Sequence, residues 1–326
     1  MDKLKRSSIG EGCAVYFRRN GGMLIGLFLL CIVISIRSPL FLTQRNIMNV
    51  LRQISANMFL ASSMTLVLII GGIDLSVGSA LALIGVISGF LLAAGVPAPL
   101  VVLCCLALGA VIGVINGVII VNTTLPPFIV TFSMMSILRG IAYVSTGGTP
   151  MRIENRNFIN VGTGYLGPVP LPVVYMGVIV AGLFLLMNKT SAGRHIYAIG
   201  GNDRAALYSG IPVKRIRFSV YVFSGVMAAV SGITLAARSY SGSPIFGTGA
   251  EMDAIAACVL GGISMLGGNG YIGGTLIGAL IIGILNNGLN LMGIDSFWQT
   301  ILRGVVILIA VYVDYIKNQK KFVLKK

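Results

Sequence analysis

Residues 97–121 decide the fold of this chain, because they read PAPLVVLCCLALGAVIGVINGVIIV without one charged side chain. A helix rises about 1.5 Å per residue, so a stretch of this length crosses the ~30 Å hydrocarbon core of a bilayer. Backbone polar groups in lipid must be bonded within their own segment, which favours an α-helix. The stretch therefore predicts a membrane-spanning helix.

The composition extends this interpretation to the whole chain. Of the 326 residues, 56% are hydrophobic and only 10% are charged, whereas soluble domains carry about 25% charged residues. This balance excludes a cytosolic enzyme, a disordered protein and a nucleic-acid-binding protein. The weakly alternating segments of about ten residues that form transmembrane β-barrels are absent from the sequence. We therefore predict an all-α polytopic membrane protein.

Ten apolar segments are candidate spans of a single transmembrane domain over residues 22–313. A cytoplasmic segment, 1–21, precedes this domain, and a basic cytoplasmic tail, 314–326, follows it. The eighth segment is short for a span, so it is predicted to be re-entrant or broken. The ten segments are Gly22–Ile36, Ala56–Ile70, Val77–Ala94, Pro97–Val121, Pro127–Val144, Val169–Met187, Phe218–Ala237, Ala254–Leu266, Tyr271–Leu291 and Ser296–Val313.

An additional amphipathic helix is predicted between the first two segments. Ile47, Val50, Leu51 and Ile54 follow the i, i+3, i+4, i+7 spacing of one helix face. Thr43 precedes them and is a suitable N-cap residue. We expect this helix to lie in the membrane interface.

The placement of Lys and Arg indicates the orientation. With the N-terminus inside, alternation puts five of them before the first span, six in 188–217 and five in 314–326 on the cytoplasmic side, against six outside. This excess follows the positive-inside rule and predicts that both termini are cytoplasmic. The net charge of +15 thus reports topology. A nucleic-acid partner would need basic residues gathered on one soluble face, and the sequence has no such face.

Glycines at intervals of four predict close helix contacts. Gly268, Gly270 and Gly273 match a dinucleotide-binding fingerprint in letters only, since no strand precedes them and they join two apolar helices. Small residues four apart let helix backbones approach closely in membranes. The two stripes are Gly270, Gly274 and Gly278, and Gly109, Gly113 and Gly117.

Residues 71–79, GGIDLSVGS, interrupt two apolar segments with a carboxylate. An ionisable group at membrane depth costs about 2.5–3.5 kcal/mol on insertion scales, which makes Asp74 a functional candidate. Asp74 or Ser76 could equally cap the third span, and both roles hold if a broken helix lines a pathway. We take Asp74, Ser76, Ser79 and Asn287 as pathway or gate candidates.

Other polar residues near the spans give weaker predictions. Glu251 and Asp253 stand two apart, so they do not share a helical face and are not a catalytic acid–base pair. They suit a helix cap or contact with a basic partner. Arg139 lies within a span, where snorkelling or pairing with a carbonyl group is expected.

Catalytic, metal and nucleotide motifs are missing from the sequence. No P-loop pattern G-x-x-x-x-G-K-[ST] occurs, so ATP binding by this chain is not expected. His195 is the only histidine and has no nucleophile or ligand constellation around it. The five cysteines show no metal-ligand spacing. We therefore predict neither an enzyme nor a resident cofactor or metal.

Four segments together resemble the permease subunits of bacterial ATP-binding-cassette sugar importers of the ribose, xylose, arabinose and allose type. The resemblance runs from about residue 24 to residue 315 and is closest to the ribose permeases. The segments are GGIDLSVGS at 71–79, RHIYAIGGN at 194–202, EMDAIA at 251–256 and NNGLN at 286–290.

This resemblance implies a bacterial inner-membrane protein of about ten helices, similar to the type II, cobalamin-importer class. It implies a second permease copy, a cytosolic ATPase that binds ATP and Mg²⁺, and a periplasmic sugar-binding protein, with Glu251 and Asp253 as docking candidates for the binding protein. Within the cytoplasmic loop 188–217, Arg204-Ala205-Ala206-x-x-x-Gly210-Ile211 resembles the E-A-A-x-x-x-G signature that docks into the ATPase, with Arg in place of Glu.

Two other classes remain open on the residues alone. An ion-coupled secondary transporter would use intramembrane carboxylates or broken helices, and Asp74 permits that class. A structural membrane scaffold has no need for the polar interruptions at 71–79 and 286–290.

Overall fold

The computed structural model describes residues 9–295, 297–302, 304–305, 308 and 312. Most of them are helical, and two pairs of two-residue strands, β1 with β4 and β2 with β3, are antiparallel. In chain order the elements are α1 Ile9–Arg37, α2 Gln44–Ile69, α3 Val77–Ala93, α4 Ala98–Asn122, α5 Pro127–Thr146, β1 Met151–Arg152, α6 Arg156–Thr163, β2 Tyr165–Leu166, β3 Val169–Pro170, α7 Leu171–Lys189, α8 Ser191–Gly201, α9 Asp203–Tyr208, α10 Val213–Arg238, β4 Ser241–Gly242, α11 Ala250–Leu260 and α12 Ile272–Leu291.

The helices confirm a polytopic membrane protein. Among the described residues, five helices are long and apolar enough to cross a membrane, namely α4, α5, α7, α10 and α12. Two shorter apolar helices cover 21–37 and α3. The tail 314–326 and residues 1–8 of the predicted N-terminal segment lie outside the described residues, as does part of the tenth candidate span. Residues 9–21 of that N-terminal segment are helical and continue into the first candidate span as α1.

The prediction of a separate interfacial helix was wrong. Residues 44–69 form one continuous helix, α2, and Val50 and Ile54 of the amphipathic stretch are buried in the protein. Thr43 does cap this helix, because its hydroxyl accepts a hydrogen bond from the Asn46 backbone N–H at 3.4 Å. The apolar face of the first turns therefore packs on neighbouring helices, whereas the prediction placed it against lipid headgroups.

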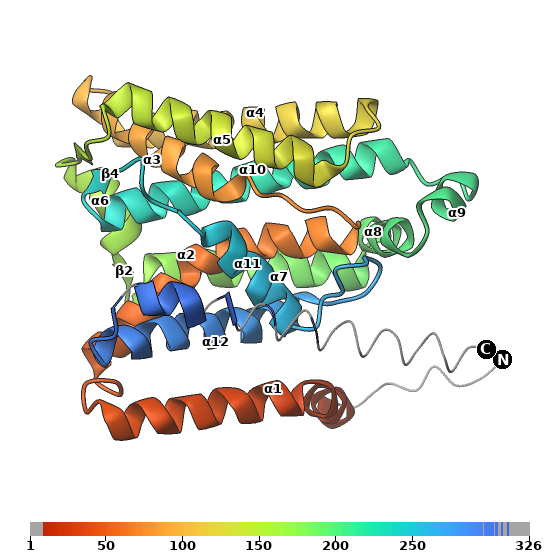
Figure 1. Ribbon diagram of the computed structural model, residues 1–326, viewed down its shortest axis with the longest axis horizontal. Coiled ribbons are helices and arrows are strands. Elements are labelled where there is room, and N and C mark those ends of the chain that lie inside the picture. The colour runs from red at the N-terminus through yellow and green to blue at the C-terminus, as the bar shows by residue number, and fades with distance from the viewer. Residues whose placement is uncertain (1–8, 296, 303, 306–307, 309–311, 313–326) are drawn as a thin grey trace.

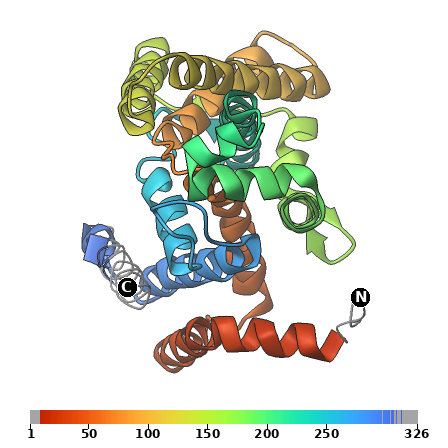
Figure 2. The same ribbon diagram turned by 90° about the vertical axis from the view of Figure 1, so that its right-hand side faces the viewer.

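α2 is the central helix of the bundle. Every residue from Met58 to Ile69 is buried, as expected of a helix that neighbours surround on all sides. Figures 1 and 2 show α2 between the group of α3, α4, α5 and α10 and the group of α11, α12 and α1. In contrast, only 33%, 28% and 17% of the apolar stretches of α4, α5 and α7 are buried, which leaves their side chains for lipid.

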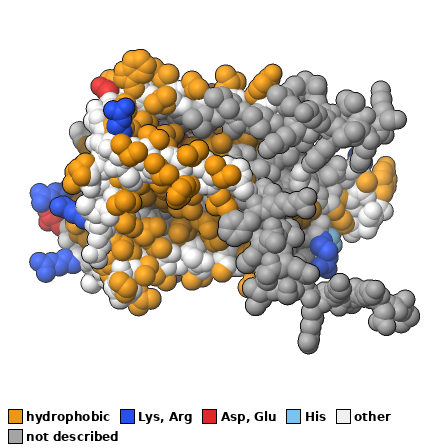
Figure 3. All heavy atoms as spheres, turned by 90° about the horizontal axis from the view of Figure 1, so that it is seen from below, with side chains coloured by type: hydrophobic (Ala, Val, Ile, Leu, Met, Phe, Trp, Pro, Cys, Tyr) orange, Lys and Arg blue, Asp and Glu red, His pale blue; other side chains and the backbone are white. Residues whose placement is uncertain are grey.

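Polar segments gather at the two ends of the bundle, and hydrophobic side chains cover the face between them (Figure 3). We call one end the sheet end, because β1 pairs with β4 there. At the sheet end Arg52 donates to the Thr163 carbonyl oxygen at 3.2 Å and Arg238 donates to Asn49 Oδ1 at 3.0 Å. Loops that the alternation of spans assigns to one side of the membrane thus meet at one end.

The opposite end, which we call the α9 end, holds α8 and α9 (Figure 1). There the Gly268 N–H donates to the Ile69 carbonyl oxygen at 2.8 Å. Tyr197 of α8 donates from its hydroxyl to the Gly270 carbonyl oxygen at 2.7 Å. The loop after α11 and the end of α2 therefore share this end with the basic loop 188–217.

The glycine stripes are helix contacts as the spacing predicts, except for Gly270, which lies in the loop before α12 and packs on Ile263. A Cβ atom on Gly109, Gly113 or Gly117 of α4 would collide with α10, and one on Gly274 or Gly278 of α12 would collide with α11. Backbones that approach this closely gain packing contacts along their whole length. The dinucleotide fingerprint at 268–273 joins α11 and α12, so rejecting it was correct.

Gly113→Ala is expected to destabilise the bundle by about 1–3 kcal/mol, because the added methyl group overpacks the α4–α10 contact. A helical Gly→Ala change otherwise stabilises by about 0.5–1 kcal/mol. Gly140 of α5 provides the matched control, since nothing lies within 4 Å of its Cβ position. Thermal unfolding of the purified protein in detergent measures both. A Gly113→Ala protein as stable as Gly140→Ala contradicts the close contact.

Candidate functional site

The chain breaks between α2 and α3, at the GGIDLSVGS segment. α2 ends at Ile69 and α3 begins at Val77, and Gly71 between them adopts φ = +78°, a conformation that glycine adopts without strain. At membrane depth, irregular backbone is tolerated where protein surrounds it. Ile73 and Asp74 meet this condition, because the Thr131 hydroxyl of α5 donates to the Ile73 carbonyl oxygen at 3.1 Å.

Asp74 is the centre of a buried polar network. Its side chain is 1% exposed. Oδ1 accepts hydrogen bonds from the Ser76 backbone N–H at 3.0 Å and from Ser76 Oγ at 2.6 Å, and Oδ2 accepts one from Ser224 Oγ of α10 at 2.7 Å. Asn116 of α4 donates to Ser76 Oγ at 2.9 Å. One carboxylate therefore holds α10 and, through Ser76, α4 against the start of α3.

The hydrogen bonds of Asp74 show which side chain caps the N-terminus of α3. Ser76 is the N-cap residue of α3 by position, but its side chain makes no capping bond. Asp74 accepts the Ser76 N–H instead, and its negative charge lies near the positive end of the α3 dipole. The carboxylate is thus both a local cap and a contact to two neighbouring spans.

Further buried polar atoms beside the break have no hydrogen-bond partner among the described residues. They include Ser79 Oγ, Asn116 Oδ1 and the Tyr221 hydroxyl. A Cβ atom on Gly72 would collide with that hydroxyl. Buried polar groups are nearly always bonded in folded proteins. A cluster of unbonded ones indicates a region whose hydrogen bonds have alternative partners.

A second break precedes α11. Residues 243–249 are non-helical and run beside α3, with Gly242 against Gly85 and Gly247 against Gly78. Arg139 of α5 donates to the carbonyl oxygens of Pro244 and Phe246, at 2.5 Å and 2.7 Å. The pairing of Arg139 with carbonyl groups, one of its two expected roles, is thus confirmed. α11 has only 11 residues, in agreement with the prediction of a broken eighth segment.

Glu251 and Asp253 follow directly after the second break. They lie in the first turn of α11 and are 9% and 7% exposed. The Glu251 carboxylate packs where a Cβ atom of Gly78 would lie, so the first turns of α3 and α11 meet here. Acidic side chains at a helix N-terminus are favoured by the dipole. This position agrees with the cap alternative through the helix dipole, and the docking role stays a prediction.

Asn287 lies in α12, where it forms a reciprocal pair with Asn46 of α2. Asn46 Nδ2 donates to Asn287 Oδ1 at 3.0 Å, and Asn287 Nδ2 donates to Asn46 Oδ1 at 2.9 Å. Asn46 also donates to the Phe41 carbonyl oxygen at 2.9 Å. Asn287 is therefore a helix-to-helix contact and shares no hydrogen bond with Asp74.

The predicted coupling residues form a projection at the α9 end (Figures 1 and 2). Arg204 and Ala205 are exposed on α9, whereas Ala206 is buried. Gly210 turns the chain with φ = +80°, and Ile211 is half-buried after it. Asn202 caps α9 through its side-chain oxygen, which accepts from the Ala205 N–H at 3.0 Å.

Sequence reasoning missed several residues of these sites. Leu207 and Tyr208 of α9 are 59% and 88% exposed, an apolar tip on a polar loop. Ser224 and Asn116 complete the Asp74 network. Asn116 is the only amide within residues 98–121, which was the signal available for it. Ser224 carried no such signal, since serines are common in these helices.

The matches with known proteins agree with this architecture. A protein-family profile described as "Branched-chain amino acid transport system / permease component" matches residues 46–311. The chain belongs to this permease family. The matched range contains both helix breaks and the projecting α8–α9 loop of the permease. A permease is a transport component and not itself a catalyst, in agreement with the absence of catalytic motifs.

Several curated relatives resemble the permease over most of its length. It is 47% identical to the Ribose import permease protein of Escherichia coli (strain K12) over 295 residues, 89% of this chain and 92% of that protein. It is 46% identical to the Ribose import permease protein of Bacillus subtilis (strain 168), over 91% and 93% of the two chains. It is 35% identical to the L-arabinose ABC transporter permease protein of Azospirillum brasilense, over 93% and 89%. No solved structure matches the chain significantly.

Proposed function

We propose that this permease is the membrane-spanning subunit of an ATP-driven importer, which moves ribose or a similar monosaccharide across the bacterial inner membrane. The observation that carries this proposal is the 43–47% identity to ribose import permeases over about nine-tenths of the chain. A periplasmic binding protein delivers the sugar. A cytosolic ATPase binds ATP and Mg²⁺, and the permease holds no cofactor of its own.

The topology of the proposal is ten membrane segments with both termini in the cytoplasm. The α9 end is then cytoplasmic and the sheet end periplasmic. The excess of Lys and Arg in 188–217 supports this assignment through the positive-inside rule. The meeting of residues 49, 52, 163 and 238 at the sheet end supports it as well, because alternation places all four outside.

Two copies of the permease are proposed to enclose the pathway, each bound to an ATPase. α9 is the part that enters the ATPase, through Arg204, Ala205, Ala206, Gly210 and Ile211 and the exposed tip beside them. ATP binding closes the ATPase pair and pulls residues 194–211. The Tyr197 hydroxyl of α8 is hydrogen-bonded to Gly270 in the loop after α11. A movement of α8 is therefore transmitted to that loop and to α11.

The gate is proposed to lie at the two helix breaks. Asp74, Ser76 and Ser79 stand at the start of α3, where the first turn of α11 meets them. Broken helices in transporters place their dipole ends and free backbone groups at the pathway. Asn287, the fourth candidate, holds α12 to the first turn of α2 through Asn46.

The test is reconstitution in liposomes with and without the ATPase. We expect import of D-ribose only when ATPase, binding protein and ATP are all present. Import that persists without an ATPase, driven by an ion gradient, identifies a secondary transporter and contradicts the proposal. Co-purification of the permease with its ATPase is an independent check.

A further inference from the structure

A polar cavity of about 240 Å³ lies within a single copy of the permease, between α2, α10, α11 and α12. Gln53 and Asn57 of α2 and Asn286 and Asn290 of α12 line it with side-chain amides. Each pair is four residues apart, so each helix presents two amides on one face about 6 Å apart. We call this space the amide cavity. Asp253 of α11 adds a carboxylate to its wall.

Three of the four amides, those of Gln53, Asn57 and Asn286, make no side-chain hydrogen bond within the described part of the chain. Asn290 is the exception, because its Oδ1 accepts a hydrogen bond from Gln299 Nε2 at 2.8 Å. Asn286 is 7% exposed, yet its side chain makes no hydrogen bond with any residue in the described part of the chain. The neighbouring Asn287 pairs fully with Asn46. Asn286 instead lines the cavity, where its amide can donate to and accept from an occupant. The sequence therefore places at Asn286 a group that is suited to an occupant with hydroxyl groups.

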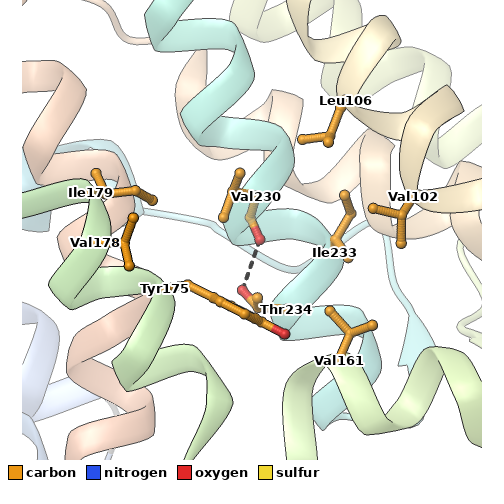
Figure 4. A pocket seen from close by; sticks show the side chains of 9 residues that line it. All are labelled: Val102, Leu106, Val161, Tyr175, Val178, Ile179, Val230, Ile233 and Thr234. Carbon is orange, nitrogen blue, oxygen red and sulfur yellow. Dashed lines mark hydrogen bonds between the residues drawn. The ribbon is translucent and has the colours of Figure 1, made fainter. Parts of the chain in front are cut away.

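The apolar pocket shown in Figure 4 gives the contrast. It has about 430 Å³ between α4, α6, α7 and α10, and aliphatic side chains form most of its wall. The Thr234 hydroxyl in its wall already donates to the Val230 carbonyl oxygen at 2.9 Å. Apart from the hydroxyl of Tyr175, this wall offers no side-chain group to orient a polar solute. The amide cavity differs because its polar groups are directed at the space itself.

We propose that the amide cavity is a subsite for one free monosaccharide in each copy of the permease, in the wall of the pathway that the two copies enclose. This inference rests on the function proposed above and adds a binding site to it. Amides donate and accept, and a carboxylate accepts, which matches the hydroxyl groups of a sugar. The volume is below the 300–1,000 Å³ that is typical for drug-sized ligands, so a single sugar ring fits.

The cavity is built for weak binding. Among the described residues that line it, none carries an aromatic ring for a sugar to stack on. Conduction requires a site that is favourable enough to enter and weak enough to leave. The selective, tight binding step then belongs to the periplasmic binding protein, and the amide cavity only replaces water around the sugar hydroxyls during passage.

The test uses the reconstituted importer with its ATPase and binding protein. Asn286→Leu and Asn57→Leu are expected to lower D-ribose import per ATP hydrolysed by about tenfold, which corresponds to the loss of one or two hydrogen bonds. ATP hydrolysis stimulated by the sugar-loaded binding protein is expected to stay within about twofold of the unmodified complex, because α9 is untouched. Asn122→Leu, the same change on an exposed site of α4, is the control and leaves both rates unchanged.

Direct binding separates this proposal from the function it rests on. Saturation-transfer NMR with D-ribose, on the importer without its binding protein, is expected to give a signal that Asn57→Leu removes. Unchanged import by both leucine variants, or an equal signal from Asn57→Leu and the unmodified importer, overturns the subsite. An unmodified complex that imports nothing with ATP contradicts the importer function, and the NMR comparison still decides the subsite. Asn57 is half-buried, so Asn57→Leu serves if Asn286→Leu fails to fold.

Discussion

Asp74→Leu is expected to abolish transport and to lower the free energy of unfolding by about 3 kcal/mol. The substitution removes the acceptor of three hydrogen bonds and leaves the Ser76 N–H, the Ser76 hydroxyl and the Ser224 hydroxyl buried without it. It also removes the negative charge at the α3 N-terminus. Thermal unfolding in detergent and ATP-driven import in liposomes measure the two effects.

Asp74→Asn separates the hydrogen bonds from the charge. The amide oxygen can still accept from Ser76, so this variant is expected to lose only about 1 kcal/mol and to fold. Ser224→Ala removes a single donor and is expected to have a smaller effect than Asp74→Leu. If Asp74→Leu is as stable and as active as Asp74→Asn, then the carboxylate does not hold the helix break.

Leu207→Asp combined with Tyr208→Asp is expected to reduce ATP-coupled import at least about 100-fold while the protein folds normally. The two side chains are the exposed apolar tip of α9. Buried apolar anchors dominate the energy of most interfaces, and loss of a hot-spot residue costs about 2 kcal/mol or more. Pull-down of the ATPase and the import rate report the loss, and an unchanged unfolding midpoint excludes misfolding.

Two comparisons sharpen this result. Ser191→Asp places one negative charge on the exposed start of α8 and is expected to leave ATPase binding intact. Gly210→Val strains a residue at φ = +80° and is expected to abolish coupling by moving α9 without touching the tip. Normal ATPase binding by the double aspartate variant contradicts the assignment of α9 as the docking element.

Much of the fold follows from the sequence because lipid imposes a simple rule. Long apolar segments without charge must be helices, and α3, α4, α5, α7, α10 and α12 end within a few residues of the predicted segments. The glycine stripes predicted close contacts correctly, since a four-residue spacing of small residues has one common use in membranes. The break at 71–79 was visible because a carboxylate interrupts an apolar pattern.

The remaining features depend on tertiary contacts that a pattern does not encode. The amphipathic stretch before Ala56 reads the same whether its apolar face meets headgroups or a neighbouring helix, and here α2 packs into the core. Glu251 and Asp253 looked like surface residues because charge usually marks an exposed loop. Glu251 packs against Gly78 at the start of α3 instead, and Asp253 lines the amide cavity. No local signal in 251–253 shows either position.

The site was predictable only in part for a related reason. Asp74 and Ser76 were identified, but their partners come from helices far along the chain. Asn286 and Asn287 are adjacent and chemically identical, yet they point to different surroundings. Adjacent residues of an α-helix point about 100° apart around its axis, so the two side chains have different neighbours. Composition does not reveal this difference.

The reciprocal amide pair between Asn46 and Asn287 limits how this bundle can move. Two hydrogen bonds between side chains of α2 and α12 prevent those helices from sliding along each other. Any change of shape that opens one end and shuts the other must then pivot elsewhere. The non-helical residues 71–76, 243–249 and 261–271 can serve as pivots, because bending there costs no intrahelical hydrogen bond. α2 and α12 become the fixed frame, and the short helices α3 and α11 become the moving parts.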